Sequence, residues 1–544
     1  MKFTEMIRRN DFLDGASLCL ILGLPLLMVG VSMYHVVNIP LLDDYGFVLS
    51  FLNDYVAADT LGSKLQVLFS SSSNYLFVTF RVWVLIDVWL FGAVDFTHIV
   101  FVNNMVHLGI IYLFYLIWKK HEISLPYFLP VVLILAVPNF MTHTWPSYLS
   151  HVLAVFFTTA TIYFCSKSTR YLPLTALAAL LAILSSPVGI LAFMAVLPFI
   201  GLKSRHTAIW IGFFLFTIVL YLVIIWPPGQ ELTDTTHSQR PLSVYAMNFV
   251  VFFGALFKPI YQDMHVWAGI FGLGICSIFL WMVAVQHRKG KVHAMVLAGF
   301  IFSFLLALLI TLMRSRYGLG ATTSYRYRLY QSLPLIFIYI ALAIHYRRIL
   351  GQYLWVICLL GMVFLGFRYV YNIERMQERN WQLNAGLHNL QVTGDPSQLS
   401  YRAPVAGVDI LKAAATAGVY SFHEVQTAIS VTKNRGRMAQ LQPMHYVLDK
   451  VEDAPEYYRI SGWAWLNHTE TQNHQIYVVV AVKGERYYYR AGPLLNSNYL
   501  MKKSTGGFMG IIDKRKLSYD WVAARLGIAI GSPSSRIIAE TMMP

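Results

Sequence analysis

Residues 16–45 read ASLCLILGLPLLMVGVSMYHVVNIPLLDDY. The stretch begins with an apolar run that is long enough, as a helix, to cross a hydrocarbon core of about 30 Å. It follows Arg8 and Arg9 and has no small-residue cleavage site at its end, so we expect an uncleaved membrane anchor. A pair of aspartates, Asp43 and Asp44, comes directly after it.

Similar apolar runs recur as far as residue 372. The 544 residues are 57% hydrophobic and only 13% charged, which exceeds the apolar content of ordinary soluble proteins. We therefore predict a mainly α-helical membrane protein. About eleven transmembrane helices are expected, near residues 16–37, 98–118, 124–140, 149–166, 171–186, 188–202, 207–226, 266–286, 293–313, 329–346 and 352–372.

The basic residues predict the orientation. The net charge is +15, but Lys and Arg cluster in short segments between apolar runs, as the positive-inside rule expects, so we predict no nucleic-acid partner. The N-terminus then lies in the cytoplasm and the C-terminus outside, in a bacterial inner membrane. The apolar stretch 76–94 would break this alternation, so we expect a re-entrant or interfacial helix within a long first outer loop, residues 38–97.

The composition changes after residue 373. We predict a polytopic transmembrane domain over residues 1–373, a helical linker region over 374–440 and a periplasmic β-sandwich over 441–544. The last prediction rests on short runs of β-branched and aromatic residues between turn signals. All four cysteines lie inside apolar runs without metal-ligand spacing, so neither disulfides nor zinc are expected.

The first candidate site is Asp43-Asp44-Tyr45. A carboxylate at the membrane surface is partly desolvated, which favours a general base, and two carboxylates also offer oxygen ligands to a divalent cation such as Mg²⁺ or Mn²⁺. The alternative is an interfacial acidic pair that only ends a helix.

The second candidate site is RSRYGLG at residues 314–320 followed by SYRYR at 324–328. Four arginines on the outer side depart from the positive-inside rule, and guanidinium groups bind phosphate oxygens in a bidentate manner. We predict a phosphate or pyrophosphate linked to a membrane lipid as ligand. The alternative is that the arginines contact lipid headgroups or outer acidic residues. The residues predicted to bind this phosphate are Arg314, Arg316, Tyr325, Arg326 and Arg328.

Weaker candidates for substrate binding lie elsewhere on the predicted outer face. Each has a structural alternative, and tryptophans at span ends are simply explained as interfacial belt residues. They are Tyr45, Asn74, Arg81, His143, Trp145 and His265.

The membrane half resembles the polytopic glycosyltransferases of the GT-C fold, which take sugars from polyprenyl-phosphate donors. The resemblance rests on topology, on Asp43-Asp44 in the first outer loop and on Arg316-Tyr317-Gly318 with Ser324-Tyr325-Arg326-Tyr327 before a late span. Similar bacterial proteins carry Asn-Glu-His-Arg in the first loop, where this chain has Asn74-Tyr75-Leu76-Phe77.

The resemblance implies an inverting transfer of a sugar to an extracytoplasmic glycan, lipid or protein. Asp44, or Asp43, would act as base, and Arg316 and Arg326 would hold the departing lipid phosphate. Membrane lipid is a further expected partner. The rival hypotheses are an O-antigen-type polymerase or ligase, a lipid-linked glycan transporter or flippase, and a receptor or scaffold built around the β domain.

Overall fold

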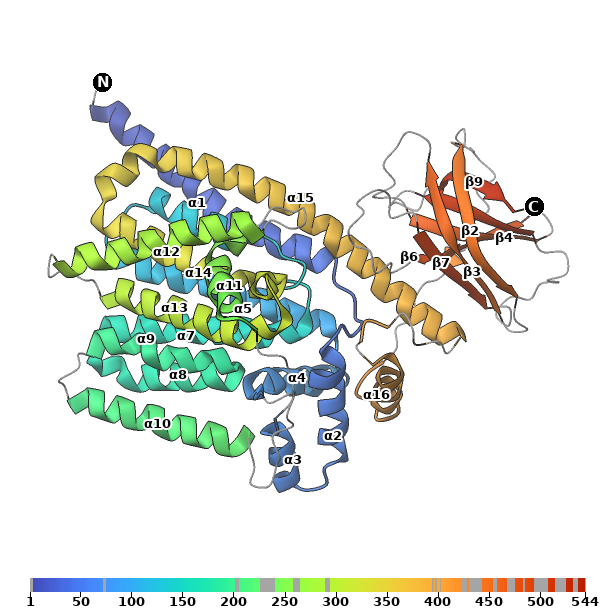
Figure 1. The fold of residues 1–544 in the computed structure, drawn as a ribbon, viewed down its shortest axis with the longest axis horizontal. Helices are drawn as coiled ribbons and strands as arrows, with labels where there is room; N and C mark the ends of the chain where they lie inside the picture. The colour runs from blue at the N-terminus through green and yellow to red at the C-terminus, as the bar shows by residue number, and fades with distance from the viewer. Residues whose placement is uncertain are drawn as a thin grey trace. The chain divides into compact units, whose positions relative to one another are not determined.

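The computed structural model is mainly helical, with a small sheet region near the C-terminus (Figure 1). It describes residues 3–71, 75–200, 205–225, 240–257, 265–288, 294–393, 396, 399–401, 403–421, 428–429, 443–453, 457–466, 475–482, 485–493, 507–513, 525–531 and 537–543.

Within these residues, eight helices are long and apolar enough to cross a membrane, which is consistent with the expected membrane protein. Each coincides with an expected span. They are α1 (Phe3–Tyr34), α5 (Phe96–Lys119), α7 (Leu149–Lys167), α10 (Arg205–Ile225), α12 (His265–Arg288), α13 (Ala294–Arg314), α14 (Arg328–His345) and α15 (Arg347–Thr393).

The other three expected spans form shorter helices. Residues 125–135 comprise η2 (Leu125–Phe128) and α6 (Leu129–Leu135), residues 172–185 form α8 (Leu172–Ser185), and residues 187–200 comprise η5 (Pro187–Ile190) and α9 (Leu191–Ile200). The longest of them would extend about 21 Å at 1.5 Å per residue, less than the hydrocarbon core. Pro187 explains one boundary, because a proline disfavours helical backbone in the residue before it.

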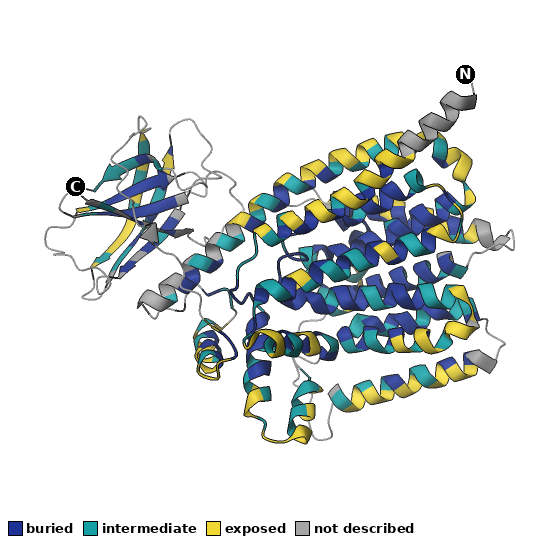
Figure 2. Ribbon diagram, turned by 180° about the vertical axis from the view of Figure 1, so that it is seen from behind, coloured by how far each residue is buried: buried dark blue, intermediate teal, exposed yellow. Residues whose placement is uncertain are grey.

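Burial separates the central helices from the peripheral ones. In α14, 83% of the residues in its apolar 18-residue stretch are buried, compared with 17% in α10 and 11% in α15. Figure 2 shows the exposed residues on the outward faces of the peripheral helices. Because the exposed residues of α10 and α15 are largely apolar, lipid is the solvent that suits these faces.

One apolar helix was not expected. α11 (Leu242–Gly254) lies between the expected spans 207–226 and 266–286, and it packs along α12. Two glycines permit this close approach. A Cβ atom at Gly254 would lie 1.8 Å from the carbonyl oxygen of Ala268, and one at Gly272 would lie 1.9 Å from that of Val250. Small residues at a helix crossing are typical of packing in membranes.

The first outer segment contains η1 (Tyr45–Ser50), α2 (Phe51–Ala57), α3 (Leu61–Leu68) and α4 (Val78–Phe91). α4 falls inside the stretch 76–94, where a helix was predicted. It ends at Gly92, whose positive φ of 82° permits the left-handed C-cap.

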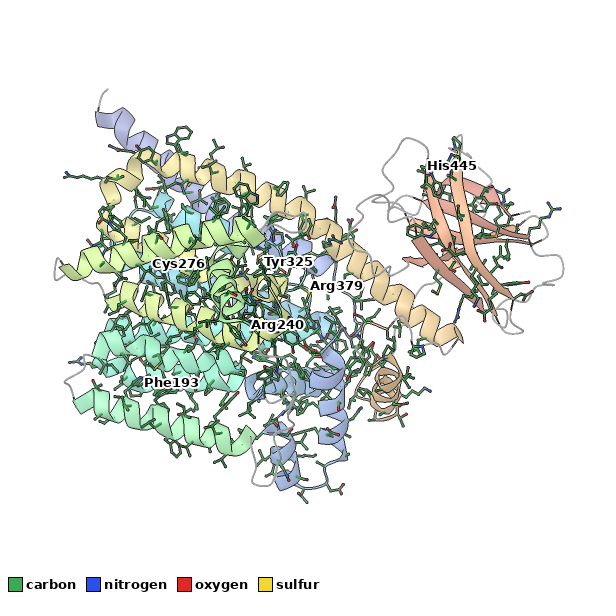
Figure 3. The ribbon with its side chains drawn as sticks, viewed as in Figure 1. Phe193, Arg240, Cys276, Tyr325, Arg379 and His445 are labelled. Carbon is green, nitrogen blue, oxygen red and sulfur yellow. The ribbon has the colours of Figure 1, made fainter. Side chains whose placement is uncertain are left out.

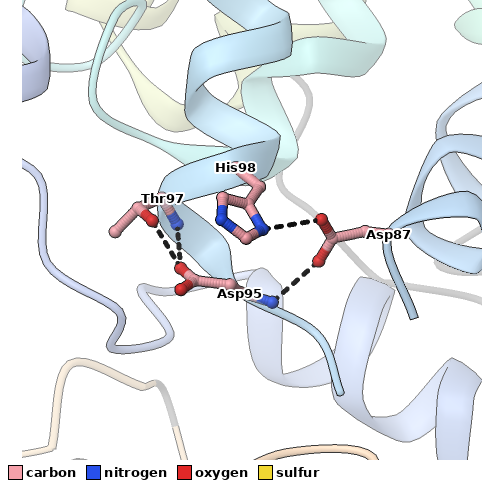
Figure 4. A network of polar contacts seen from close by, with 4 residues as sticks. All are labelled: Asp87, Asp95, Thr97 and His98. Carbon is pink, nitrogen blue, oxygen red and sulfur yellow. Dashed lines mark hydrogen bonds and ion pairs between the residues drawn. The ribbon is translucent and has the colours of Figure 1, made fainter. Parts of the chain in front are cut away.

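A polar network fixes the end of α4 against the start of α5 (Figure 4). The Asp87 carboxylate accepts the N–H of Asp95 at 2.8 Å and contacts Nδ1 of His98 at 3.0 Å. Asp95 in turn caps α5, accepting the N–H of Thr97 at 2.7 Å. Burial raises the pKa of Asp87 despite these contacts, so its ionised form is disfavoured in the folded protein.

Asp87→Asn should therefore gain stability relative to the wild type as the pH rises. A carboxyl group whose pKa is raised by folding contributes stability below its unfolded pKa of about 3.9 and loses it as the pH passes the folded value. An asparagine keeps one acceptor for Asp95 and one polar contact for His98 without a buried charge. Thermal unfolding of both proteins at pH 4.5 and 7.5 tests this, with Asp95→Asn as the control. A variant less stable than the wild type at pH 7.5 would contradict the expectation.

The chain divides into two compact units: residues 1–36 with 46–373, and residues 37–45 with 374–544. The segment carrying the two aspartates thus groups with the C-terminal unit. That unit also holds α16 (Pro404–Thr416), which lies inside the region 374–440 that was expected to be a helical linker.

The strands form two antiparallel sheets. One has the order β1-β5-β4-β8-β9 and the other β2-β3-β7-β6. Both contribute to one buried core, with Ile460 and Phe508 from the second sheet against Val478 and Ile528 from the first. The strands are β1 (Ala428–Ile429), β2 (Met444–Asp453), β3 (Tyr457–Leu466), β4 (Gln475–Val482), β5 (Glu485–Arg490), β6 (Gly492–Pro493), β7 (Gly507–Asp513), β8 (Arg525–Gly531) and β9 (Ile537–Met542).

Candidate functional site

The two aspartates lie in a tight turn after α1. The N–H of Leu41 donates to the Asp44 carboxylate at 2.9 Å, and the N–H of Asp44 donates to the Leu41 carbonyl at 3.0 Å. Between them, Leu42 has a positive φ of 51°, which is uncommon for a residue other than glycine. Asp44 is fully buried, whereas Asp43 is only partly buried. The turn therefore leaves Asp43 as the carboxylate that solvent can reach.

Residues 400–420 hold this turn from the other end of the chain. The N–H of Leu42 donates to the Ser400 carbonyl at 2.7 Å, and the Tyr420 hydroxyl donates to the Asn38 carbonyl at 3.0 Å. We call these contacts the 38–45 clasp. They fix the backbone on both sides of the aspartates.

A stacked tyrosine pair completes the 38–45 clasp. The rings of Tyr45 and Tyr401 lie 4.7 Å apart at 24°. Gly407 of α16 lies against both, because a Cβ atom there would be 3.0 Å from the Tyr401 ring and 3.5 Å from the Tyr45 ring. Burial, and then the nearby Tyr420 and Asp44, raise the pKa of Tyr45. The Tyr45 hydroxyl consequently stays neutral, so it can donate a hydrogen bond but cannot serve as a base.

The arginine-rich turn 314–328 belongs to the first unit and joins α13 to α14. It consists of η7 (Ser315–Tyr317), η8 (Ala321–Thr323) and η9 (Tyr325–Tyr327), separated by Gly318 and Gly320, which have φ values of 104° and 79°. Figure 3 shows Tyr325 toward one end of the long helices.

Asn248 of α11 holds this turn in shape. Its side-chain nitrogen donates to the Ser315 hydroxyl and the Gly318 carbonyl, both at 3.0 Å, and its side-chain oxygen accepts the N–H of Gly320 at 2.7 Å. Asn248 is fully buried. The unexpected helix α11 is thus what positions the arginine-rich turn.

Three arginines of the turn lie against aromatic rings. Arg314 lies 5.8 Å from the Tyr317 ring centroid, Arg316 lies 4.9 Å from the same centroid, and Arg326 lies 5.7 Å from that of Trp145. In the described part of the chain, no carboxylate forms an ion pair with any of the three. Aromatic faces orient a guanidinium without neutralising it, so its charge remains available to an anion.

The fourth arginine is different. Arg328 is buried at the start of α14, where its Nη1 donates to the carbonyls of Ala255 and Leu256 at 2.7 and 2.8 Å. Tyr325, also predicted to bind phosphate, shares a hydrogen bond of 2.7 Å with Tyr371 of α15 and lies over Arg328. Both residues therefore face the interior of the helical unit.

The weaker candidates have different surroundings. Trp145 lies with Arg326, as described. Arg81 is buried on α4, and its Nη1 donates to the carbonyls of Val67, Leu68 and Ser70, so it caps the end of α3; burial lowers its pKa to about 10. Asn74 and the side chain of His265 lie outside the described residues.

His143 is buried in the loop after α6. Its Nδ1 accepts the N–H of Asn139 at 2.9 Å, and its ring meets that of His107 edge-on at 4.7 Å. Burial, with a smaller effect of His107, lowers the pKa of His143 well below its usual value. His143 is therefore a neutral imidazole whose proton is on Nε2.

A divalent cation would find an incomplete set of protein ligands. Among the described residues, no group of three or more His, Cys, Asp or Glu side chains is arranged to hold a metal ion. Asp43 and Asp44 are adjacent carboxylates, and Mg²⁺ is often held by one or two carboxylates with water and substrate phosphate as the other ligands. Asp43 and Asp44 could therefore supply only part of the ligands of such an ion.

Sequence reasoning missed several residues of this arrangement. Asn248 had a usable signal, because a polar residue inside an apolar run is rarely without a role. Tyr401 and Tyr420 had none, because nothing in the sequence joins them to the first outer loop.

No protein-family model matches this chain, and no curated protein or solved structure matches it either.

Proposed function

We propose that this chain is a membrane glycosyltransferase that moves a sugar from a polyprenyl-phosphate donor to an extracytoplasmic glycan, lipid or protein. The observation that supports it most is the arginine-rich turn, where Arg314, Arg316 and Arg326 lie against aromatic rings at the end of two apolar helices without a described carboxylate partner. A membrane-bound phosphate is an anion that suits such a position.

The proposal includes an orientation and a domain organisation. The N-terminus lies in the cytoplasm of a bacterial cell and the C-terminal unit in the periplasm, as the basic clusters favour. The eleven expected spans include the three shorter apolar helices. The two sheets with a common core are interpreted as a β-sandwich.

The reaction would be a single displacement. The acceptor hydroxyl oxygen attacks the anomeric carbon while the bond from that carbon to the phosphate oxygen breaks, with inversion of configuration. A carboxylate takes the hydroxyl proton, and Arg314, Arg316 and Arg326 stabilise the charge on the departing lipid phosphate. Asp43 is partly exposed, whereas Asp44 is fully buried and keeps the turn in shape. We therefore assign the role of proton acceptor to Asp43.

A Mg²⁺ or Mn²⁺ ion, if required, would be held by Asp43 and Asp44. Such an ion would supply positive charge at the acidic pair. Tyr45 is excluded as the base by its raised pKa. No cytoplasmic nucleotide takes part in this proposal.

The experiment is an incubation of the purified full-length protein in detergent with a panel of polyprenyl-phosphate sugars. The release of polyprenyl phosphate is followed with and without an acceptor, and with and without EDTA. Release from one donor supports the transferase, and its loss in EDTA would assign a metal. No release from any donor, together with specific binding of a lipid pyrophosphate glycan, would instead favour a polymerase, ligase or flippase.

A further inference from the structure

Two buried arginines lie close together inside the helical unit. Arg328 of α14 is 5% exposed and Arg368 of α15 is 2% exposed, and both lie within apolar helices of membrane-spanning length. Each is within electrostatic reach of the other. Within the described residues, neither forms an ion pair with a carboxylate. Two like charges in such a position need a compensating negative charge.

The hydrogen-bonding capacity of the two guanidiniums is only partly used. Nη1 of Arg328 is satisfied by two carbonyls, and the Tyr325 side chain interacts with the same guanidinium. Among the described residues, no well-aligned hydrogen bond reaches Nε or Nη2 of Arg328 or Nε of Arg368. The linked Tyr325 and Tyr371 lie beside them, with ring centroids 5.1 Å from Arg328 and 5.6 Å from Arg368 respectively. Buried donors of this kind are normally satisfied.

Both arginines line one small cavity of about 30 Å³. Thr142 and His143 line it too, and the buried Nε2 of His143 has no partner among the described residues. Since Nδ1 of His143 accepts a backbone N–H, Nε2 carries the proton and is a donor. His107 provides the contrasting group: its Nε2 bonds to the Leu135 carbonyl, which leaves Nδ1 as an acceptor.

We propose that this cavity binds a small inorganic anion of about the size of chloride. The unsatisfied groups are mainly donors, and two of the residues that carry them are positively charged. A water molecule would fit the volume, but it would not offset the charge. A cavity of this size admits a monatomic ion. Arg314, Arg316 and Arg326 do not line this cavity, and the anion site does not depend on the transferase proposal.

The test measures thermal unfolding of the purified full-length protein in a neutral detergent at constant pH and ionic strength. Sodium gluconate is replaced stepwise by sodium chloride or bromide. A site filled only in the folded state should raise the Tm by about 3 °C or more, with a saturating dependence on the anion concentration. An equal Tm in gluconate and chloride at all concentrations would overturn the proposal.

Two variants assign the effect to this cavity. Arg368→Met removes one buried charge, so its Tm should no longer respond to chloride, even if the protein is as stable as the wild type. Arg347→Gln, at an exposed arginine on the same helix, should keep the full response. A chloride response that persists in Arg368→Met would overturn the assignment. So would stabilisation by polyprenyl phosphate alone, because the arginines would then belong to the donor site. If Arg368→Met fails to fold, Arg368→Lys should shift the midpoint of the chloride response to higher concentration.

Discussion

Asp43→Asn should lower the rate of sugar transfer from a polyprenyl-phosphate donor by about 10²- to 10⁴-fold, the range that a positioned general base contributes. An asparagine has nearly the same shape as an aspartate but cannot accept a proton at neutral pH. Asp43 is partly exposed, and the hydrogen bonds described for the turn are made by other residues, so the fold should be retained. The measurement is polyprenyl phosphate release at saturating donor, with the Tm as a check on folding.

Two comparisons make this result interpretable. Asp59→Asn changes an exposed carboxylate of the same outer segment and should leave the rate unchanged. Asp44→Asn keeps an oxygen that can accept the Leu41 N–H, so an activity loss larger than that of Asp43→Asn would move the base to Asp44. Full activity in both variants would remove the acidic pair from the reaction.

Gly272→Ala should destabilise the protein by about 3 kcal/mol or more, because an added methyl group would collide with the backbone rather than with a flexible side chain. Its Cβ atom would lie 1.9 Å from the Val250 carbonyl oxygen and 3.2 Å from the Gly254 nitrogen. α11 would have to move away from α12, and Asn248 on α11 would be displaced from the arginine-rich turn. We therefore expect a fall in both Tm and transfer activity.

Gly274→Ala is the matched control on the same helix. A Cβ atom at Gly274 meets nothing within 4 Å, and alanine favours helical backbone more than glycine does. The control should match the wild type or be more stable by up to about 1 kcal/mol. Equal behaviour of the two variants would show that the α11–α12 contact is not tight.

The sequence located the long helices well because hydropathy over about 20 residues is a strong signal. α11 was not predicted, because its 13 residues are too few for that hydropathy signal and because polar segments flank the helix. Of the three shorter spans, only 124–140 was overestimated, because α6 ends at Leu135 although the apolar run continues, whereas the other two lie within two residues of their expected bounds.

The candidate site was predictable only in part. Residue chemistry indicated Asp43 and the arginines, and position in the chain indicated that Trp145 belongs to the same predicted face as Arg326. The different environment of Arg328 could not be predicted. It is buried, unlike the other three arginines, because its guanidinium bonds to the carbonyls of Ala255 and Leu256. The contacts of Tyr420 with Asn38 connect residues 382 positions apart, a separation at which sequence patterns carry no information.

The 38–45 clasp also has a consequence for biosynthesis. The two aspartates emerge from the ribosome early, but Ser400, Tyr401 and Tyr420 follow only after all the long apolar helices. The backbone around the acidic pair therefore cannot reach its final form on a nascent chain that still lacks the later residues. A chain that stops after α15 would contain every long apolar helix and still lack the residues that order the backbone around Asp43.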